Sequence, residues 1–228
     1  MKLVLFDIDG TLLHADGAGA VATYRSLRDF YGVETTPPGY SMAGKVDTQI
    51  VLELAAHAGV DEAAIRARLA DYWAAYAATL VEELPRRECV VLPGVFELLA
   101  ALAGRPDVVV GLLTGNVETG ARLKLEAAGI APAQFRVGAF GHEAETREAL
   151  PALAVARAEE QVGHPFRRKD IVIIGDTPSD VACGASLGVR AIGVATGHYS
   201  VAQLQAAGAD TVFPDLSDTQ AVLAAILA

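Results

Sequence analysis

The sequence contains few cysteines, few aromatic residues and no long apolar segment. Its 228 residues include two cysteines, Cys89 and Cys183, which excludes a disulfide framework and a cysteine-rich metal site. We interpret both as small core residues in a reducing compartment. No apolar run approaches the length of about 20 residues that a transmembrane helix needs. The run after Lys2 is stopped by Asp7, too early for a signal peptide. The sequence therefore predicts a cytoplasmic protein.

Positive charge is also scarce, because 18 lysines and arginines face 28 acidic residues, for a formal net charge of −10. Such a charge argues against binding nucleic acid or an anionic membrane through the overall field, although a local basic pocket could still bind an anion. Hydrophobic residues make up 52% of the chain, which is enough for a packed core. We expect a small-molecule partner and a monomer or homodimer.

Three apolar runs predict strands that are buried on both faces of a parallel sheet. They are "KLVLFD", "DVVVGLLT" and "DIVIIGD", which end at Asp7, Thr114 and Asp176. Each is followed by turn residues and a helical pattern, as in βα units. Shorter strands are predicted over 135–138, 189–194 and 211–213, and helices over 95–103, 118–128, 150–162, 179–187, 201–207 and 219–227. The sequence predicts an α/β fold with a doubly wound, mostly parallel sheet.

Residues 16–83 interrupt this alternation, because they contain no convincing strand. Helical patterns cover 18–31, 47–57 and 61–83, separated by turn-rich pieces such as "GVETTPPGY". A first crossover does not need some seventy residues. We therefore predict a catalytic core of residues 1–15 and 84–228, with a small α-helical domain, 16–83, inserted after the first strand. Its hinges are expected near 13–17 and 84–93.

Carboxylates gather where the predicted strands end, which is where open parallel sheets bind ligands. Asp7 and Asp9 lie two residues apart and are expected to point the same way in extended chain. Asp180 lies one turn past Asp176, after Pro178. Two unit charges 4 Å apart repel by about 4 kcal/mol at an effective dielectric of 20. Up to four such groups require protonation or a cation, and Mg²⁺ together with a phosphate suits this ligand set.

These residue types can divide the work of phosphoryl transfer. One aspartate can attack phosphorus, and the other can exchange a proton with the leaving oxygen and then with water. The hydroxyl of Thr114 and free backbone N–H groups can bind phosphoryl oxygens. A protein cation should offset the charge in the transition state, and the candidates are Lys45, Lys124 and Arg147.

Three motifs together resemble the haloacid dehalogenase superfamily, in its phosphoglycolate-phosphatase-like branch. They are "DIDGT" (7–11), "LLTGN" (112–116) and "GDTPSD" (175–180), and the insertion lies where that branch carries its cap. The resemblance implies a Rossmann-like core with a helical cap. It also implies Mg²⁺-dependent hydrolysis of a small phosphorylated metabolite, similar to phosphoglycolate, through an aspartyl-phosphate.

The same resemblance implies a role for each matching residue. Asp7 would be the nucleophile and a metal ligand, and Asp9 the acid/base, with its backbone carbonyl on the metal. Thr114 would bind the phosphoryl group. Asp176 would bind the metal directly, and Asp180 would bind it through water or orient other groups. The substrate-binding candidates are Thr11, Gly115 and Asn116 in these motifs and Lys45 in the insertion.

The third motif of the superfamily departs from its usual lysine. The corresponding segment "HEAETREALPALAVARA" offers Arg147, which we assign to the cation role, with Lys124 as the alternative. Other activities on the same core remain open. A phosphomutase would share these residues, and a phosphonatase would use Lys45 to form a Schiff base. A dehalogenase is disfavoured by the second aspartate of "DID", and a non-catalytic phosphate-responsive regulator by the insertion.

Overall fold

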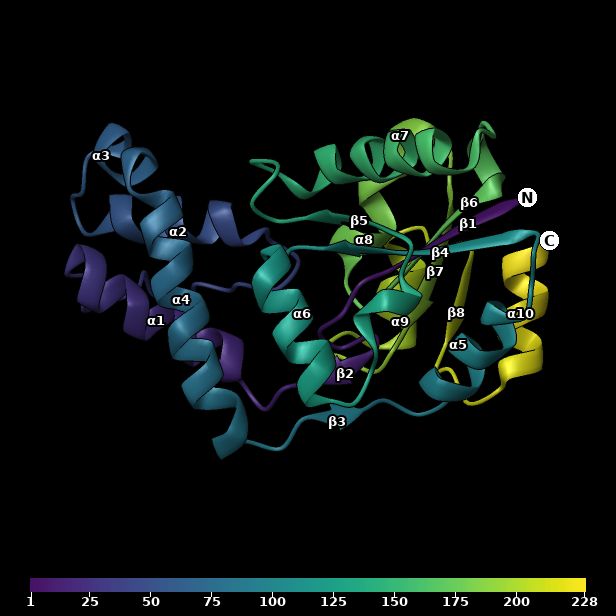
Figure 1. Ribbon diagram of the computed structural model, residues 1–228, viewed down its shortest axis with the longest axis horizontal. Helices are drawn as coiled ribbons and strands as arrows, with labels where there is room; N and C mark the ends of the chain where they lie inside the picture. The colour runs from purple at the N-terminus through teal and green to yellow at the C-terminus, as the bar shows by residue number, and fades with distance from the viewer.

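Six parallel strands form the central sheet of the computed structural model, which describes residues 1–228 (Figure 1). The strand order is β5-β4-β1-β6-β7-β8. Their bounds are β1 Lys2–Phe6, β4 Val108–Thr114, β5 Val137–Phe140, β6 Ile171–Gly175, β7 Arg190–Val194 and β8 Thr211–Phe213. The prediction of a doubly wound, mostly parallel sheet is confirmed, and β1 lies between two strands from much later in the chain.

Helices cover both faces of this sheet, as the alternation of buried side chains in β1 requires. Val4 and Phe6 pack in one cluster with α5 (Val95–Ala103), α6 (Glu118–Ala127) and α10 (Thr219–Leu227). Leu3 and Leu5 pack in another with α7 (Leu150–Val162) and Cys183 of α8 (Pro178–Cys183). The short α9 (Val201–Ala206) contributes Leu204 to a third, small cluster. No helix combines the length and apolar composition needed to span a membrane.

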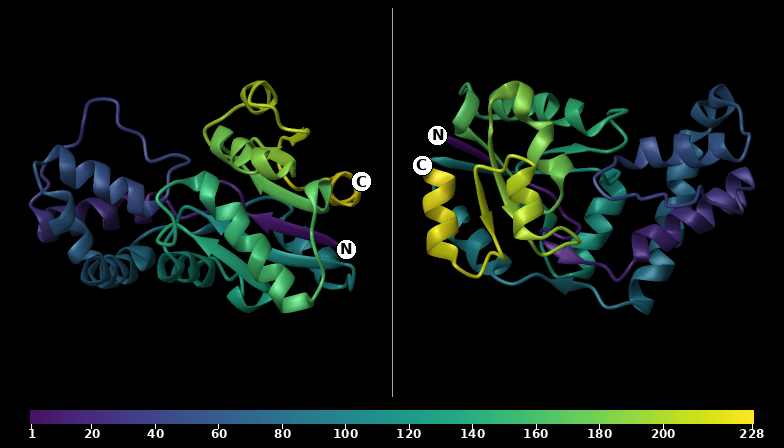
Figure 2. Two further views of the ribbon diagram at one scale, coloured as in Figure 1. Left: turned by 90° about the horizontal axis from the view of Figure 1, so that it is seen from above. Right: turned by 180° about the vertical axis from the view of Figure 1, so that it is seen from behind.

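Four helices between β2 and β3 lie beyond the carboxyl ends of the strands (Figures 1 and 2). They are α1 (Ala18–Tyr31), α2 (Asp47–His57), α3 (Glu62–Ala67) and α4 (Leu69–Glu83). Tyr72, Tyr76 and Leu80 of α4 are fully or almost fully buried and belong to the larger core cluster. We call residues 16–83 the cap; its bounds as a domain stay a prediction.

The structure differs from the predicted elements in a few places. The helix predicted over 61–83 is two helices, because Arg68 leaves helical geometry and its guanidinium lies 4.1 Å from the Phe30 ring centroid. The chain forms two short strands that were not predicted, β2 (Leu13–His14) and β3 (Val90–Val91), which pair antiparallel across the two segments joining the cap to the core. β5 begins two residues later than expected, and α8 ends at Cys183 rather than continuing to 187.

Candidate active site

Three neighbouring strands bring reactive side chains to one edge of the sheet. Asp7 directly follows β1, Thr114 ends β4, and Asp176 directly follows β6. Because these strands are parallel and adjacent, their carboxyl ends meet at the same edge. The edge faces the cap, so any molecule bound there is also within reach of the helical segment (Figure 1).

Three of the carboxylates form a compact buried group, which we call the acidic cluster. Oxygens of Asp7, Asp176 and Asp180 lie within 4.8 Å of one another. The three residues are 6%, 5% and 1% exposed, so water can screen little of their mutual repulsion. The hydroxyl of Thr11 donates a hydrogen bond to Asp176 at 3.3 Å. The negative charge of the acidic cluster must therefore be neutralised mainly by groups other than water.

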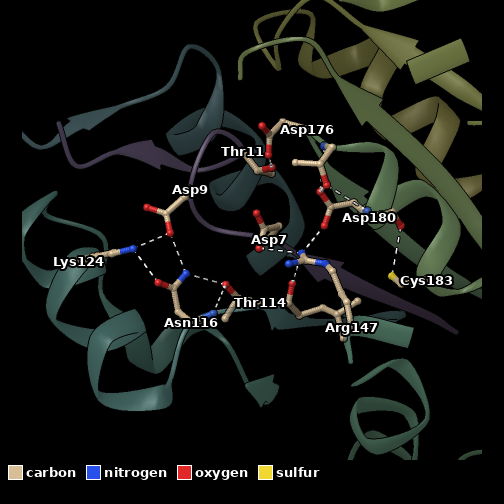
Figure 3. Close-up of polar contacts among 12 residues, drawn as sticks. Asp7, Asp9, Thr11, Thr114, Asn116, Lys124, Arg147, Asp176, Asp180 and Cys183 are labelled. Carbon is tan, nitrogen blue, oxygen red and sulfur yellow. Dashed lines mark hydrogen bonds and ion pairs between the residues drawn. The ribbon is translucent and has the colours of Figure 1, made fainter. Parts of the chain in front are cut away.

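Arg147 supplies one positive charge to this cluster. It lies just before α7, is 5% exposed, and donates to Asp7 at 2.9 Å, to the Leu113 carbonyl at 3.3 Å and to Asp180 (Figure 3). Burial acts to lower the pKa of Arg147, but the charges of Asp180 and Asp7 outweigh it and raise the pKa above its usual value. The guanidinium therefore stays charged against the predicted nucleophile.

The start of α8 fixes the position of Asp180. In a capping box, the Thr177 hydroxyl accepts from the Asp180 N–H, while the Asp180 carboxylate accepts from the Thr177 N–H at 2.9 Å. The Thr177 hydroxyl also lies 2.6 Å from that carboxylate. One oxygen of Asp180 is thus bound to its own helix start and the other to Arg147. The sequence "TPSD" specifies this geometry, since proline suits the first turn of a helix.

Of the up to four carboxylates expected together, three form the acidic cluster, and Asp9 lines the same cavity, described below, outside that cluster. Its carboxylate accepts from Lys124 at 2.6 Å and from Asn116 at 2.8 Å. The side-chain amide of Asn116 also donates to the Thr114 hydroxyl at 2.8 Å and accepts from Lys124 at 2.6 Å. We call Asp9, Thr114, Asn116 and Lys124 the Asp9 group (Figure 3).

The two aspartates separate because the extended strand ends before them. β1 stops at Phe6, and the chain turns at Gly10 with a left-handed φ of 80°. The Asp7 carboxylate turns toward Arg147 and the Asp9 carboxylate toward Lys124 (Figure 3). Two of the three candidate cations, Arg147 and Lys124, therefore lie at the site, each with a different aspartate.

Burial and charge shift the pKa values of the two groups in opposite directions. Burial raises the pKa of Asp7 to about 6, although Arg147 acts against the shift. Burial, together with the charges of Asp7 and Asp180, raises the pKa of Asp176 to about 8. For Asp9, burial would raise the pKa, but Lys124 and Asn116 outweigh it and lower the pKa below its usual value. The acidic cluster is short of positive charge, whereas the Asp9 group is balanced.

The acidic cluster fits a hard divalent cation. Its donors are carboxylate oxygens, which Mg²⁺ prefers, and one arginine leaves negative charge uncompensated. The chain also makes room for Asp176: a Cβ added at Gly10 or Gly197 would stand 2.4 Å and 1.8 Å from one of its oxygens. Asp7 and Asp176 are the side chains best placed to hold the ion.

A cavity of about 950 Å³ lies between this edge and the cap. The core contributes Asp7, Asp9 and Asp176 to its lining, and the cap contributes Tyr24 and Lys45 among others. The cavity thus gives a ligand access to both aspartates of "DID". Its size is ample for a small metabolite.

The cap is held against the core by the first residues of α2. The Asp47 N–H donates to the Gly115 carbonyl at 2.7 Å, and the Asp47 carboxylate accepts from the Val117 N–H at 2.8 Å. The Thr48 N–H donates to the Gly141 carbonyl at 3.3 Å. A Cβ on Gly141 would stand 1.7 Å from the Gly115 carbonyl oxygen, so this close approach requires glycine. Burial raises the pKa of Asp47 to about 6.

The substrate-binding candidates occupy different environments. Asn116, Gly115 and Lys45 line the cavity, although the Gly115 carbonyl is used by Asp47. Thr11 is fully buried, donates to Asp176 and is absent from the lining, in contrast to the substrate contact expected for it. Thr114 is also fully buried, with its hydroxyl accepting from Asn116.

Sequence reasoning missed Asp47 and Glu53. Asp47 begins a helix, where aspartate is common, and nothing in the sequence indicates that it meets Val117 from the core. Glu53 lies one turn farther along α2 than Gln49 and binds Lys45, as described below. In the sequence, these two residues could be recognised only as polar residues on a predicted helix.

Comparisons with known proteins agree with this architecture. Residues 4–185 match the family described as haloacid dehalogenase-like hydrolase. The chain is 31% identical over 224 residues to a phosphoglycolate phosphatase of Rhodospirillum rubrum, covering 95% of this chain and 88% of that protein. It is 28% identical over 232 residues to a probable phosphatase, IndB, of Dickeya dadantii, covering 99% and 94%. A crystal structure of a hydrolase from Pseudomonas syringae superposes with a TM-score of 0.71, at 20% identity and 98% coverage of both chains.

The family match, together with the α/β core and the carboxylates at its strand ends, identifies a hydrolytic enzyme. The chain belongs to the haloacid dehalogenase-like hydrolases, and its curated relatives are phosphatases. The resemblance drawn from "DIDGT", "LLTGN" and "GDTPSD" is confirmed, and the reading as a non-catalytic regulator is set aside.

Proposed function

We propose that this enzyme hydrolyses a small phosphate monoester with the help of Mg²⁺, through a phosphorylated Asp7. The observation that carries the proposal is the position of Asp7, which lines the cavity, belongs to the acidic cluster and contacts Arg147 at 2.9 Å. The relatives named as phosphatases support the same reaction class. We expect it to act on a phosphorylated metabolite in the cytoplasm, as a monomer or homodimer.

In the first step, an oxygen of Asp7 attacks phosphorus while the bond between phosphorus and the leaving oxygen breaks. The leaving oxygen takes a proton from Asp9. Arg147 holds the attacking carboxylate in place and offsets charge that builds up on the phosphoryl oxygens. In the second step, water attacks the phosphorus of the aspartyl-phosphate and gives a proton back to Asp9, which frees Asp7 and phosphate.

Asp9 must carry a proton in the first step, whereas Lys124 and Asn116 hold its pKa below the usual value. The Asp9 side chain is 44% exposed toward the cavity. A substrate that fills the cavity excludes water from this carboxylate, and burial favours its protonated form. Movement of the Asp9 side chain away from Lys124 would have the same effect, so substrate binding prepares the acid.

The predicted ligands of Mg²⁺ are Asp7 and Asp176 with the backbone carbonyl of Asp9, and Asp180 acts through water or by orientation. When bound, the ion supplies positive charge to the phosphoryl oxygens. The residues of the chain keep the other tasks, since Arg147 positions Asp7 and Asn116 positions Asp9.

Turnover of p-nitrophenyl phosphate with Mg²⁺, and its loss in Asp7→Asn, test the proposal. Wild-type turnover by the folded variant would sink it. A phosphomutase would return an isomeric phosphate ester instead of free phosphate. A phosphonatase would be inactivated by borohydride with phosphonoacetaldehyde; the Lys45 nitrogen is bound to Glu53 in the structure, which disfavours that reading.

A further inference from the structure

The cap offers the cavity a single cationic side chain. The cap contains Arg25, Arg28, Lys45, Arg66 and Arg68, and of these only Lys45 lines the cavity. The arginines pair elsewhere, for example Arg25 with Glu83 at 2.5 Å. Any negative charge on the part of the substrate that faces the cap therefore depends on Lys45.

The positive charge of Lys45 is already neutralised by a glutamate that lies farther along the chain. Its ammonium donates to one oxygen of Glu53 and lies 4.3 Å from the centroid of the Tyr40 ring. The Tyr40 hydroxyl donates to the same oxygen at 2.8 Å, and the Gln49 amide donates to the other oxygen at 2.8 Å. We call Tyr40, Lys45, Gln49 and Glu53 the Glu53 cluster. Three donors bind Glu53, so we expect Lys45 to keep this partner while a ligand binds.

The cations of the core are occupied as well. Lys124 pairs with Asp9, and Arg147 pairs with Asp7 and Asp180. Further acids, Asp16, Asp47 and Glu88, line the same cavity. The remaining basic side chains of the lining are His14 and His198, and the His14 ring already contacts the Thr196 carbonyl at 3.1 Å. A carboxylate on the leaving group would therefore enter an acidic space in which every lysine and arginine is already paired, and a charge without a partner away from water is strongly disfavoured.

Neutral polar groups are well provided for in this cavity. Hydroxyl-bearing side chains from the cap line it, namely Thr23, Tyr24, Tyr40, Ser41 and Tyr76. The ammonium of Lys45 has three hydrogens, so it can donate to a hydroxyl of the substrate while it stays bound to Glu53. The volume of about 950 Å³ also leaves room for a leaving group larger than two carbons.

We propose that Glu53 is a specificity-determining residue, which neutralises Lys45 and directs the enzyme toward phosphate esters of uncharged, hydroxyl-bearing alcohols. Esters whose alcohol carries a carboxylate, as phosphoglycolate does, are then poor substrates. The inference rests on the proposed phosphatase function and deepens it by naming the class of leaving group.

A matched pair of substrates tests this directly. Phosphoglycolate and 2-hydroxyethyl phosphate have the same number of carbons and differ in a carboxylate against a hydroxymethyl group. For the wild-type enzyme we expect kcat/KM to be at least about 10-fold higher for 2-hydroxyethyl phosphate. An equal value, or a preference for phosphoglycolate, overturns the inference without any variant being made.

Substitution of Glu53 then tests the residue. Glu53→Gln keeps one of the two acceptor oxygens and removes the charge, so the relative kcat/KM for phosphoglycolate should rise by about 5-fold, mainly through a lower KM. The gain should vanish in the double variant Glu53→Gln with Lys45→Met. Glu62→Gln, which removes one of the two carboxylate partners of Arg66 outside the cavity, is the control and should leave the ratio unchanged.

The outcomes separate the two proposals. An unchanged ratio in folded Glu53→Gln, with p-nitrophenyl phosphate still hydrolysed, overturns the assignment of Glu53 and leaves the phosphatase function intact. If the wild-type enzyme hydrolyses neither of the two esters nor p-nitrophenyl phosphate, the proposed phosphatase function is wrong, and the inference fails with it.

Discussion

The two halves of the active site treat their carboxylates in opposite ways. In the acidic cluster, Asp7, Asp176 and Asp180 are at most 6% exposed and share Arg147 as their cation. In the Asp9 group, one carboxylate keeps 44% of its side chain exposed and has Lys124 and Asn116 to itself. The acidic cluster is shielded from water, and its negative charge exceeds its positive charge. The Asp9 group is partly exposed to water, and its opposite charges balance.

This difference indicates how two aspartates separated by one residue can take different roles. Burial raises the pKa of Asp7 to about 6, while Lys124 and Asn116 outweigh burial at Asp9 and lower its pKa. A carboxylate that lacks compensation attracts a metal ion and a phosphoryl group. One that is compensated and faces the cavity can respond to the substrate that covers it.

The largest effects on turnover should come from replacing Asp7 in the acidic cluster and Asp9 in the Asp9 group. Asp7→Asn removes the attacking oxygen, and we expect turnover of p-nitrophenyl phosphate to fall by more than about 10³-fold. Asp9→Asn should still accept phosphorus but lose about 10²–10⁴-fold in turnover, because the proton transfer is lost. Acid quenching with a phosphorus-labelled substrate should trap the aspartyl-phosphate in Asp9→Asn and not in Asp7→Asn. Wild-type rates in Asp9→Asn would refute the proton-transfer role.

Removal of the two cations should sharpen the comparison. Arg147→Ala leaves the buried carboxylates of Asp7 and Asp180 without their cation, although Asp180 keeps its hydrogen bonds to Thr177, so we expect a loss of about 3–5 kcal/mol in the free energy of unfolding. We also expect kcat/KM to fall at least about 10-fold. Lys124→Ala should destabilise less, since water reaches Asp9. Urea unfolding measures the change in stability, and steady-state kinetics measure the change in kcat/KM. If the Arg147→Ala enzyme is unaffected, the cation role belongs to Lys124.

A smaller effect is expected from Mg²⁺ on stability. At 100 times its dissociation constant, Mg²⁺ should stabilise the wild-type protein by about 2.7 kcal/mol. Asp176→Asn should lose this response and yet, at pH 8 and without metal, unfold at a higher temperature than the wild type. The reason is that burial and the neighbouring carboxylates raise the pKa of Asp176 to about 8, so its ionisation costs stability as pH rises to that value. Calorimetry with EDTA or Mg²⁺ would test this, and a Mg²⁺ response retained by Asp176→Asn would remove Asp176 from the ligand set.

The smallest effect concerns Asp47, which brings a second carboxylate to the side of the Asp9 group. Its pKa is raised to about 6, mainly by burial, so its contribution favours the folded state at low pH and is lost as pH rises from about 4 through 6. Asp47→Asn keeps an oxygen that can accept from Val117. The variant should gain about 1 kcal/mol over the wild type between pH 4 and 7, or about 2–4 °C in Tm.

The exposed Asp71→Asn serves as the control for that experiment, since it lies in the first turn of α4. Its stability relative to the wild type should change little with pH. If the difference in stability between Asp47→Asn and the wild type does not change with pH, then ionisation of Asp47 does not destabilise the contact of α2 with the core.

The strongly patterned elements could be predicted from the sequence. The helices over 18–31, 47–57, 95–103, 150–162 and 219–227 have the predicted bounds, and so does the strand over 211–213. The strand-end positions of Asp7, Thr114 and Asp176 followed from uninterrupted apolar runs and the parallel sheet that they imply. These are local patterns, and the fold agrees with them.

Tertiary contacts account for what was missed. Arg68 suits a helix, but the predicted segment divides at this residue, whose guanidinium lies over the Phe30 ring. The separation of Asp7 from Asp9 arises from the turn at Gly10 and from Lys124, far along the chain. Glu53 reads as an ordinary helix residue until Lys45 is seen beside it.

The central place of β1 has a consequence for biosynthesis. Leu3 to Phe6 are synthesised well before the two strands that flank them, β4 and β6. At roughly 5–20 residues per second, the nascent chain spends on the order of ten to thirty seconds before β6 emerges. During that interval a bare apolar strand can meet other chains. Yield in the cell should therefore depend on chaperones and on translation speed as well as on the stability of the finished enzyme.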